Sequence, residues 1–113
     1  MTLIMVMYIA SGILLSALSI PLILRKIKPN GLYGFRVKQT LEDPTLWYAV
    51  NTYAGKRLFV AGICTSFTAA ILYQVPGLSL DTYALACLAV TFIVLVIGIT
   101  QSVLFMKKQE HIK

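Results

Sequence analysis

The sequence predicts an all-α membrane protein with three transmembrane helices. Of its 113 residues, 58% are hydrophobic and only 12% are charged, with a mean hydropathy of +0.82. Soluble chains contain about 45–50% apolar and about 25% charged residues. A chain this short cannot bury the excess in a core, so much of it must face lipid. The sequence also holds three stretches without formal charge, each long enough to cross a bilayer.

The first uncharged stretch covers residues 2–24. At about 1.5 Å per residue it crosses the roughly 30 Å hydrocarbon core as a helix. Arg25 and Lys26 follow this stretch, whereas a cleaved signal peptide has its basic residues in front. We therefore expect a retained helix, bent in its last turn by Pro21.

The second helix has a clear start signal. Asp43 can cap it, and Pro44 suits the first helical position, where no backbone N–H is needed. A helix from Pro44 to Val75 would be about 48 Å long, which exceeds the membrane. We therefore expect residues 44–57 to lie at or below the headgroups and residues 58–75 to span the bilayer.

The third helix follows a short turn. Pro76 and Gly77 should end the second helix, and Asp81 is predicted to cap the third. Residues 82–106 carry no charge and are long enough to span with some tilt. The basic pair Lys107–Lys108 then ends the span.

The distribution of charge predicts the orientation. Ten basic residues face four acidic ones, and all ten basic residues lie in the 25–57 loop or the C-terminal tail. The positive-inside bias places loop and tail in the cytoplasm and the N-terminus outside, in one membrane domain of residues 1–113. We interpret the following cations as topology anchors that touch anionic lipid: Arg25, Lys26, Lys56, Arg57, Lys107 and Lys108.

Each span carries small residues that could bring helices close together. In lipid, helices associate mainly by close packing of such residues. Three helices bury little surface, so a homo-oligomer is compatible with the sequence, although helix contacts within one chain account equally well for these residues. The strips are Gly12 and Ser16, then Gly62, Ser66 and Ala70, then Gly98 and Ser102.

Several functional classes are disfavoured. The spans contain no carboxylate or histidine that could carry protons at membrane depth, which argues against a proton-coupled transporter. No catalytic constellation is visible, so we expect no enzyme activity. The sequence also shows no metal-ligand cluster and no sign of a cofactor. Although the net charge is +6, no nucleic-acid motif accompanies it, so we expect no nucleic-acid partner.

The 25–57 loop is the most informative segment because its composition is not that of a solvated linker. Trp47, Asn51 and Gly55 are spaced by four and share one helix face. Arg36 offers a planar fork of donors that suits a carboxylate or phosphate. We expect the loop to form a compact cytoplasmic cap. Its polar residues could contact a ligand, or they could serve turns and helix caps while the aromatic residues lie at the interface.

The ordered motif residues resemble the signature of the SdpI bacterial immunity-protein family. The matching positions are Pro29, Asn30, Tyr33, Gly34, Phe35, Arg36, Thr40, Trp47, Asn51 and Gly55. The resemblance implies a protein of the bacterial inner membrane. It also implies protection against a secreted peptide toxin and, when toxin is present, capture of a cytoplasmic transcriptional repressor. The namesake has six spans, and this chain resembles its motif-bearing half.

The leading hypothesis is therefore a non-enzymatic immunity or resistance protein with a peptide toxin and a repressor as partners. The first alternative is a membrane module that binds a lipid headgroup or another anionic ligand through Arg36, Lys38, Lys56 and Arg57. The second alternative is an accessory subunit of a larger membrane complex.

Overall fold

The computed structural model describes residues 1–30, 34 and 36–112, and it is helical with no strand among those residues. Three of its helices are long and apolar enough to cross a membrane, which confirms the predicted fold class. The short helix α2 was not predicted. The elements are α1 (Thr2–Ile23), α2 (Lys38–Glu42), α3 (Pro44–Tyr73) and α4 (Leu80–Ile112).

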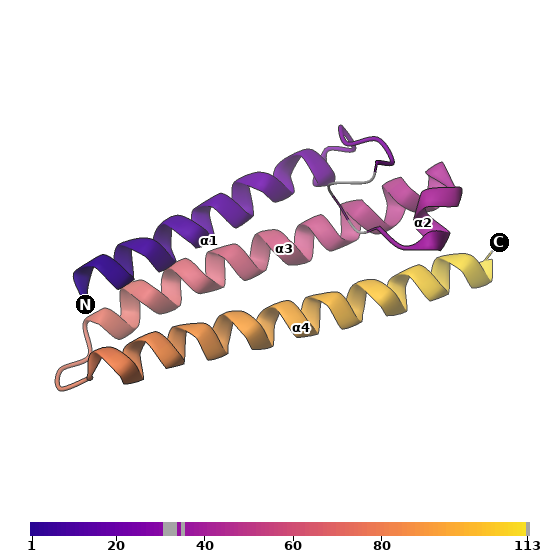
Figure 1. Ribbon diagram of the computed structural model, residues 1–113. Coiled ribbons are helices and arrows are strands. Elements are labelled where there is room, and N and C mark those ends of the chain that lie inside the picture. The colour runs from indigo at the N-terminus through magenta and orange to yellow at the C-terminus, as the bar shows by residue number, and fades with distance from the viewer. Residues whose placement is uncertain (31–33, 35, 113) are drawn as a thin grey trace.

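The long helices lie side by side with α3 between α1 and α4 (Figure 1). The bundle is elongated, with extents of 54 × 23 × 18 Å. The connection after α1, helix α2, the start of α3 and the last turns of α4 gather at one end, here called the basic end (Figure 1). The N-terminus and the turn between α3 and α4 lie at the opposite end.

Helix α1 ends in a Schellman motif at Arg25. The N–H of Arg25 donates to the carbonyl of Leu22 at 3.2 Å, and the N–H of Lys26 donates to the carbonyl of Pro21 at 2.9 Å. These two bonds satisfy carbonyls that the helix end would otherwise leave open. Arg25 adopts a φ of 61°, a left-handed conformation that is more common for glycine. This motif ends α1 and starts the connection at the basic end.

Helix α3 begins as predicted. The Asp43 carboxylate accepts the N–H of Thr45 at 3.0 Å and that of Leu46 at 3.3 Å, and Pro44 occupies the first turn. The side chain thus satisfies two of the donors that every helix start exposes. The helix ends at Tyr73, two residues before the predicted end at Val75.

The predicted cap of the third helix was wrong by two residues. Helix α4 begins at Leu80, and Ser79 Oγ accepts the N–H of Thr82 at 3.2 Å. Asp81 lies inside the first turn, where its negative charge interacts favourably with the positive end of the helix dipole. A hydroxyl directly before the helix can reach a free donor, which explains why Ser79 takes the capping role.

The contact between α1 and α3 is closest at two glycines. A Cβ built on Gly12 would collide with the carbonyl oxygen of Gly62 and with Ser66 Oγ. A Cβ built on Gly62 would collide with the carbonyl oxygen of Gly12 and with Ser16 Oγ. The two antiparallel helices therefore present the same Gly-x-x-x-Ser pattern to each other. We call this contact the glycine seam.

Two hydroxyls cross the glycine seam in the same reciprocal way. Ser16 Oγ donates to the carbonyl of Phe59 at 2.9 Å, and Ser66 Oγ donates to the carbonyl of Ile9 at 3.0 Å. Each acceptor lies three residues before the glycine of its own helix. Close backbone approach and hydrogen bonds between helices are what hold membrane helices together in lipid. The first two predicted small-residue strips thus pack against each other.

Larger side chains mediate the contact between α3 and α4. Tyr83 is fully buried, and its hydroxyl donates to the carbonyl of Ala69 at 2.6 Å. Nearer the middle of the bundle, the hydroxyls of Thr65 and Thr91 lie 3.0 Å apart. These polar contacts are spread along the interface, and no backbone approach as close as that of the glycine seam accompanies them at Gly98, whose added Cβ would lie 3.2 Å from Arg57 Cβ.

Candidate functional site

The loop motif is attached to α3 through Trp47. This side chain is fully buried, and its indole Nε1–H donates to the carbonyl of Ile27 at 2.8 Å. Ile27 lies just after the Schellman motif that ends α1. A buried indole needs a hydrogen-bond acceptor for its N–H, and here the acceptor is a backbone carbonyl just after α1. Trp47 therefore ties the start of α3 to the end of α1.

Gly34 lies directly on the same helix face. Its φ is +113°, which is unfavourable for residues other than glycine. A Cβ at this position would lie 2.8 Å from Asn51 Oδ1 and 3.1 Å from Trp47 Cη2. Both the backbone conformation and the available space therefore require glycine. We call the contact of Gly34 with Trp47 and Asn51 the loop lock.

Asn51 lies beneath Gly34 and is only 2% exposed. Its Nδ2 donates to the carbonyl of Trp47 at 3.0 Å, one turn earlier in α3. A buried amide must be hydrogen-bonded to offset its lost contact with water. In this conformation the Asn51 side chain lies against Gly34 and supports the loop.

Gly55 lies one turn further along this face and contacts α1. A Cβ here would lie 3.0 Å from Ile23 Cγ1, 3.1 Å from Leu22 Cβ and 3.2 Å from the carbonyl oxygen of Ser19. Trp47, Asn51 and Gly55 therefore do lie on one face of α3, and this face is a packing surface. It carries the loop at one end and the last turn of α1 at the other.

Thr40 is also buried, within α2. Its hydroxyl donates to the carbonyl of Val37 at 2.9 Å and accepts the N–H of Val37 at 3.0 Å. This reciprocal pair closes the first turn of a helix of only five residues. Thr40 thus fixes the local backbone between the loop and α3, which is a structural task.

The remaining motif positions are more open. Pro29 and Asn30 are half-buried, and Asn30 Nδ2 donates to the carbonyl of Lys28 at 2.7 Å, so its amide braces the turn. Arg36 is exposed. Tyr33 and Phe35 lie outside the described residues. The structure therefore brings Gly34, Trp47 and Asn51 together and leaves Arg36 on the surface.

An aromatic stack joins α3 and α4 at the basic end, and sequence reasoning missed it. The rings of Tyr53 and Phe105 are stacked, with centroids 4.4 Å apart and planes inclined by 4°. The Arg57 guanidinium lies over the Tyr53 ring, 5.1 Å from its centroid. Tyr53 and Arg57 are four residues apart, which was a signal for a helical neighbour pair. Nothing local in the sequence identified Phe105.

The predicted anchors lie at two different levels along the bundle. Gly98 of α4 packs against Arg57, and Lys107 comes nine residues later in the same helix, about 13 Å further along at 1.5 Å per residue. The backbone of Arg57 therefore lies closer to the middle of the bundle than that of Lys107. Its guanidinium reaches toward the basic end, over Tyr53. All six predicted anchors are exposed: Arg25, Lys26, Lys56, Arg57, Lys107 and Lys108.

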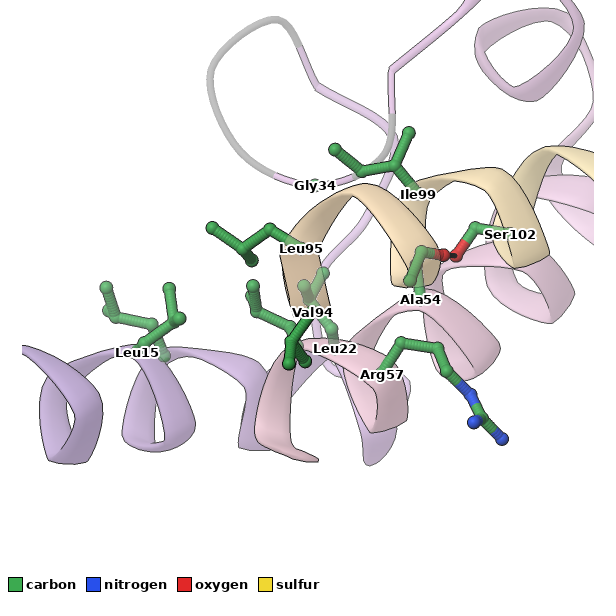
Figure 2. A pocket seen from close by; sticks show the side chains of 12 residues that line it. Leu15, Leu22, Gly34, Ala54, Arg57, Val94, Leu95, Ile99 and Ser102 are labelled. Carbon is green, nitrogen blue, oxygen red and sulfur yellow. Dashed lines mark hydrogen bonds between the residues drawn. The ribbon is translucent and has the colours of Figure 1, made fainter. Parts of the chain in front are cut away.

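A cavity of about 350 Å³ opens between α1 and α4, next to the loop lock (Figure 2). We call it the lateral groove. Leucines of α1 and branched residues of α4 form its walls, and α3 forms its floor. Its polar lining side chains are Arg57 and Ser102. The lining residues are Leu15, Leu18, Leu22, Gly34, Ala54, Arg57, Leu58, Val94, Leu95, Gly98, Ile99 and Ser102.

Helices α1 and α4 both pack on α3, and they also contact each other near the opposite end. There Tyr8 Oη donates to the carbonyl of Ala84 at 3.0 Å. Toward the basic end the two outer helices leave a gap, which Gly34 closes at one side. Within the described part of the chain, no three His, Cys, Asp or Glu side chains lie together as a metal site.

The comparison with protein-family models gives one match. The model of the SdpI/YfhL protein family matches residues 26–102, which is more than half of the chain. The match includes the loop lock, all of α3 and most of α4. No curated protein and no solved structure matches the chain. This multi-helix membrane protein, with its motif built into the lock between loop and helix, belongs to the SdpI/YfhL family.

Proposed function

We propose that this chain is a non-enzymatic immunity protein that protects a bacterial inner membrane against a membrane-active peptide toxin. The observation that carries the proposal is family membership over residues 26–102, together with the incorporation of the motif into the loop lock. The predicted orientation, with the basic end in the cytoplasm, is part of the proposal. It rests on the gathering of the basic residues at one end of the bundle.

The chemistry of the spans supports binding rather than transport or catalysis. The three uncharged stretches contain no carboxylate, lysine, arginine or histidine that could carry a proton at membrane depth. What they offer instead is apolar surface, much of it exposed on α1 and α4, for example at Leu14 and Phe92. A membrane-active peptide would meet this surface and the short turn at the opposite end without leaving the bilayer.

The loop lock gives a physical route from the spans to the cytoplasm. Trp47 holds the carbonyl of Ile27, and Gly55 packs on the last turn of α1. A displacement of α1 by a bound peptide would therefore strain the contact of Gly34 with Asn51. In this proposal, the locked loop stabilises the protective conformation and reports changes in it.

Expression in a toxin-sensitive bacterium tests the immunity role. Cells that carry the chain should survive an Sdp-type peptide better than cells with an empty vector. Gly34→Leu should remove the protection because it breaks the loop lock. Gln39→Ala, on the exposed side of α2, is the matched control and should protect fully. Immunoblots of membranes check that the three proteins reach equal levels.

Unchanged survival with wild-type protein present in the membrane would overturn the immunity role. Full protection by Gly34→Leu would leave immunity in place and remove the loop lock from the mechanism.

The reporting role toward a cytoplasmic repressor has its own test. Arg36 is an exposed motif residue at the basic end, so it is positioned to contact a soluble partner. A fluorescent repressor from the same operon should move to the membrane when peptide and chain are both present. Arg36→Ala should prevent this movement, whereas a repressor that stays in the cytosol with the wild-type chain would contradict the role.

A further inference from the structure

We propose that the lateral groove is a binding site for one acyl chain of an anionic phospholipid, whose phosphate pairs with Arg57. The proposal does not rest on toxin immunity, because it concerns lipid of the surrounding leaflet. Three properties of the groove carry it: its size, its lining and the position of Arg57 among the described lining residues.

The size of the groove selects its occupant. A volume of about 350 Å³ holds roughly a dozen groups of water or methylene size at about 30 Å³ each. From Leu15 to Leu22 the α1 wall rises by about 10 Å. A helix with side chains is about 10 Å across and would not fit into such a space. The volume therefore favours part of one hydrocarbon chain over a whole helix of a peptide or of a second copy.

The lining of the groove selects an apolar guest. Leu15 and Leu22 of α1 line the groove together with Val94 and Leu95 of α4 (Figure 2). One of the two polar lining groups is already satisfied, because Ser102 Oγ donates to the carbonyl of Gly98 at 2.7 Å. A hydrocarbon chain beside Ser102 would therefore leave no hydroxyl without a hydrogen-bond partner.

Arg57 then selects the sign of the headgroup. Its Cβ lies in the tight contact with Gly98, while its guanidinium extends away from Leu15 toward the basic end (Figure 2). Long basic side chains behave in this way when they start below the headgroups and reach toward them. A planar guanidinium at this height suits a phosphate with two parallel hydrogen bonds.

The depth of the site agrees with a lipid of the leaflet at the basic end. The groove runs from Arg57 toward Leu15, which lies near the middle of the bundle. One leaflet contributes about 15 Å of hydrocarbon, so a chain that starts at Arg57 would follow the groove for most of this depth. In the predicted orientation this leaflet is the cytoplasmic one, which is rich in anionic lipid.

Native mass spectrometry of the full chain in detergent tests the proposal. Dioleoyl phosphatidylglycerol is the anionic probe, and dioleoyl phosphatidylcholine has the same chains without net charge. We expect one tightly retained phosphatidylglycerol per chain and weaker retention of phosphatidylcholine. Arg57→Gln should weaken phosphatidylglycerol binding about fivefold, as expected for one cation near a membrane phosphate. Equal retention of both lipids by the wild-type chain would overturn the proposal.

Two matched pairs of variants locate the site. Lys56→Gln removes the neighbouring exposed cation, which does not line the groove, and should change binding little. Val94→Phe places a ring in the groove and should weaken retention, whereas Val96→Phe adds the same ring on the exposed side of α4 and should not. Far-UV circular dichroism and Trp47 emission verify that each variant is folded.

The outcomes are decisive in both directions. If Lys56→Gln weakens binding as much as Arg57→Gln, the interaction is a general attraction of the basic end and the proposed site is wrong. If Val96→Phe acts like Val94→Phe, the groove is not the site. Glycerol phosphate at the lipid's concentration should not displace the lipid, and displacement would show a headgroup site without the acyl chain. A dimer that Val94→Phe dissociates would identify a second copy as the occupant instead.

Discussion

The two interfaces of α3 are built on opposite principles. Along the glycine seam, the backbones of α1 and α3 approach so closely that neither Gly12 nor Gly62 has room for a Cβ. Between α3 and α4, larger side chains such as Tyr83 fill the space, and a Cβ on Gly98 would lie 3.2 Å from Arg57 Cβ, a tight contact that a shift of a few tenths of an ångström relieves. Helices that meet through glycine cannot adjust to a larger residue, whereas an interface of side chains can repack.

The comparison also explains the position of the lateral groove. The loop lock continues the α1–α3 contact past the end of α1, so these two helices form one unit up to the basic end. Helix α4 is held to this unit by dispersed contacts. The space between the outer helices therefore depends on α4, and α4 is the helix whose position a guest in the groove would change most readily.

Gly62→Leu provides the largest contrast between the interfaces. The new side chain would collide with the carbonyl of Gly12, so we expect a loss of at least about 3 kcal/mol in the free energy of unfolding. Gly98→Ala on the other interface should cost less than about 1 kcal/mol, since only the Arg57 Cβ must yield. Unfolding in dodecyl sulfate mixed micelles, followed by circular dichroism, measures both. Equal losses would refute the distinction.

Gly34→Ala tests whether the loop belongs to the α1–α3 unit. The positive φ and the short distance to Asn51 should together cost about 1–3 kcal/mol. The single tryptophan, Trp47, lies under Gly34, so its emission should shift toward the red as water gains access. Gly77→Ala is the control, because it also has a positive φ but no neighbour within 4 Å. An unchanged emission would show that the loop is not held there.

Trp47→Phe tests the attachment of the loop and of the α1 exit to α3. It keeps one aromatic ring but removes the donor to the carbonyl of Ile27 and the ring atoms that contact Gly34, which should cost about 1–3 kcal/mol. Hydrogen exchange of the residues after α1 should accelerate, since their attachment to α3 is weakened. Tyr48→Phe, at the half-buried neighbouring position, controls for a general effect of aromatic substitution. Exchange that accelerates equally in both variants would count against a specific attachment.

Thr65→Val should give the smallest effect. The substitution keeps the shape and removes the 3.0 Å contact with the hydroxyl of Thr91. Thr91 retains its bond to the carbonyl of Cys87, so no buried donor is left without a partner. Hydrogen bonds between membrane helices are worth about 0.6 kcal/mol on average, and we expect a loss of this size by the same unfolding measurement. A loss above 2 kcal/mol would mean that this interface depends on one polar pair.

The sequence predicted those features that depend on local chemistry. Span length, the Asp43 cap and the shared face of Trp47, Asn51 and Gly55 follow from charge-free length, a capping carboxylate and the helical period. Each of these can be read within a few neighbouring residues. The same holds for the failure at Asp81, where a second local cap, Ser79, competed and was closer to the helix start.

Features that join distant segments could not be predicted in the same way. The stack of Tyr53 on Phe105 and the packing of Gly98 on Arg57 depend on how each helix is rotated about its axis. A helix that is apolar on all sides carries no stripe that reveals this rotation, unlike the amphipathic helices of soluble proteins. The lateral groove was missed for the same reason, since it requires knowledge of which faces the outer helices leave unpaired.

The central position of α3 also sets an order of assembly. Both members of the glycine seam precede Leu80 in the chain, so α1 and α3 leave the ribosome before α4 and can pair first. Insertion would then proceed by adding one last helix to a finished pair.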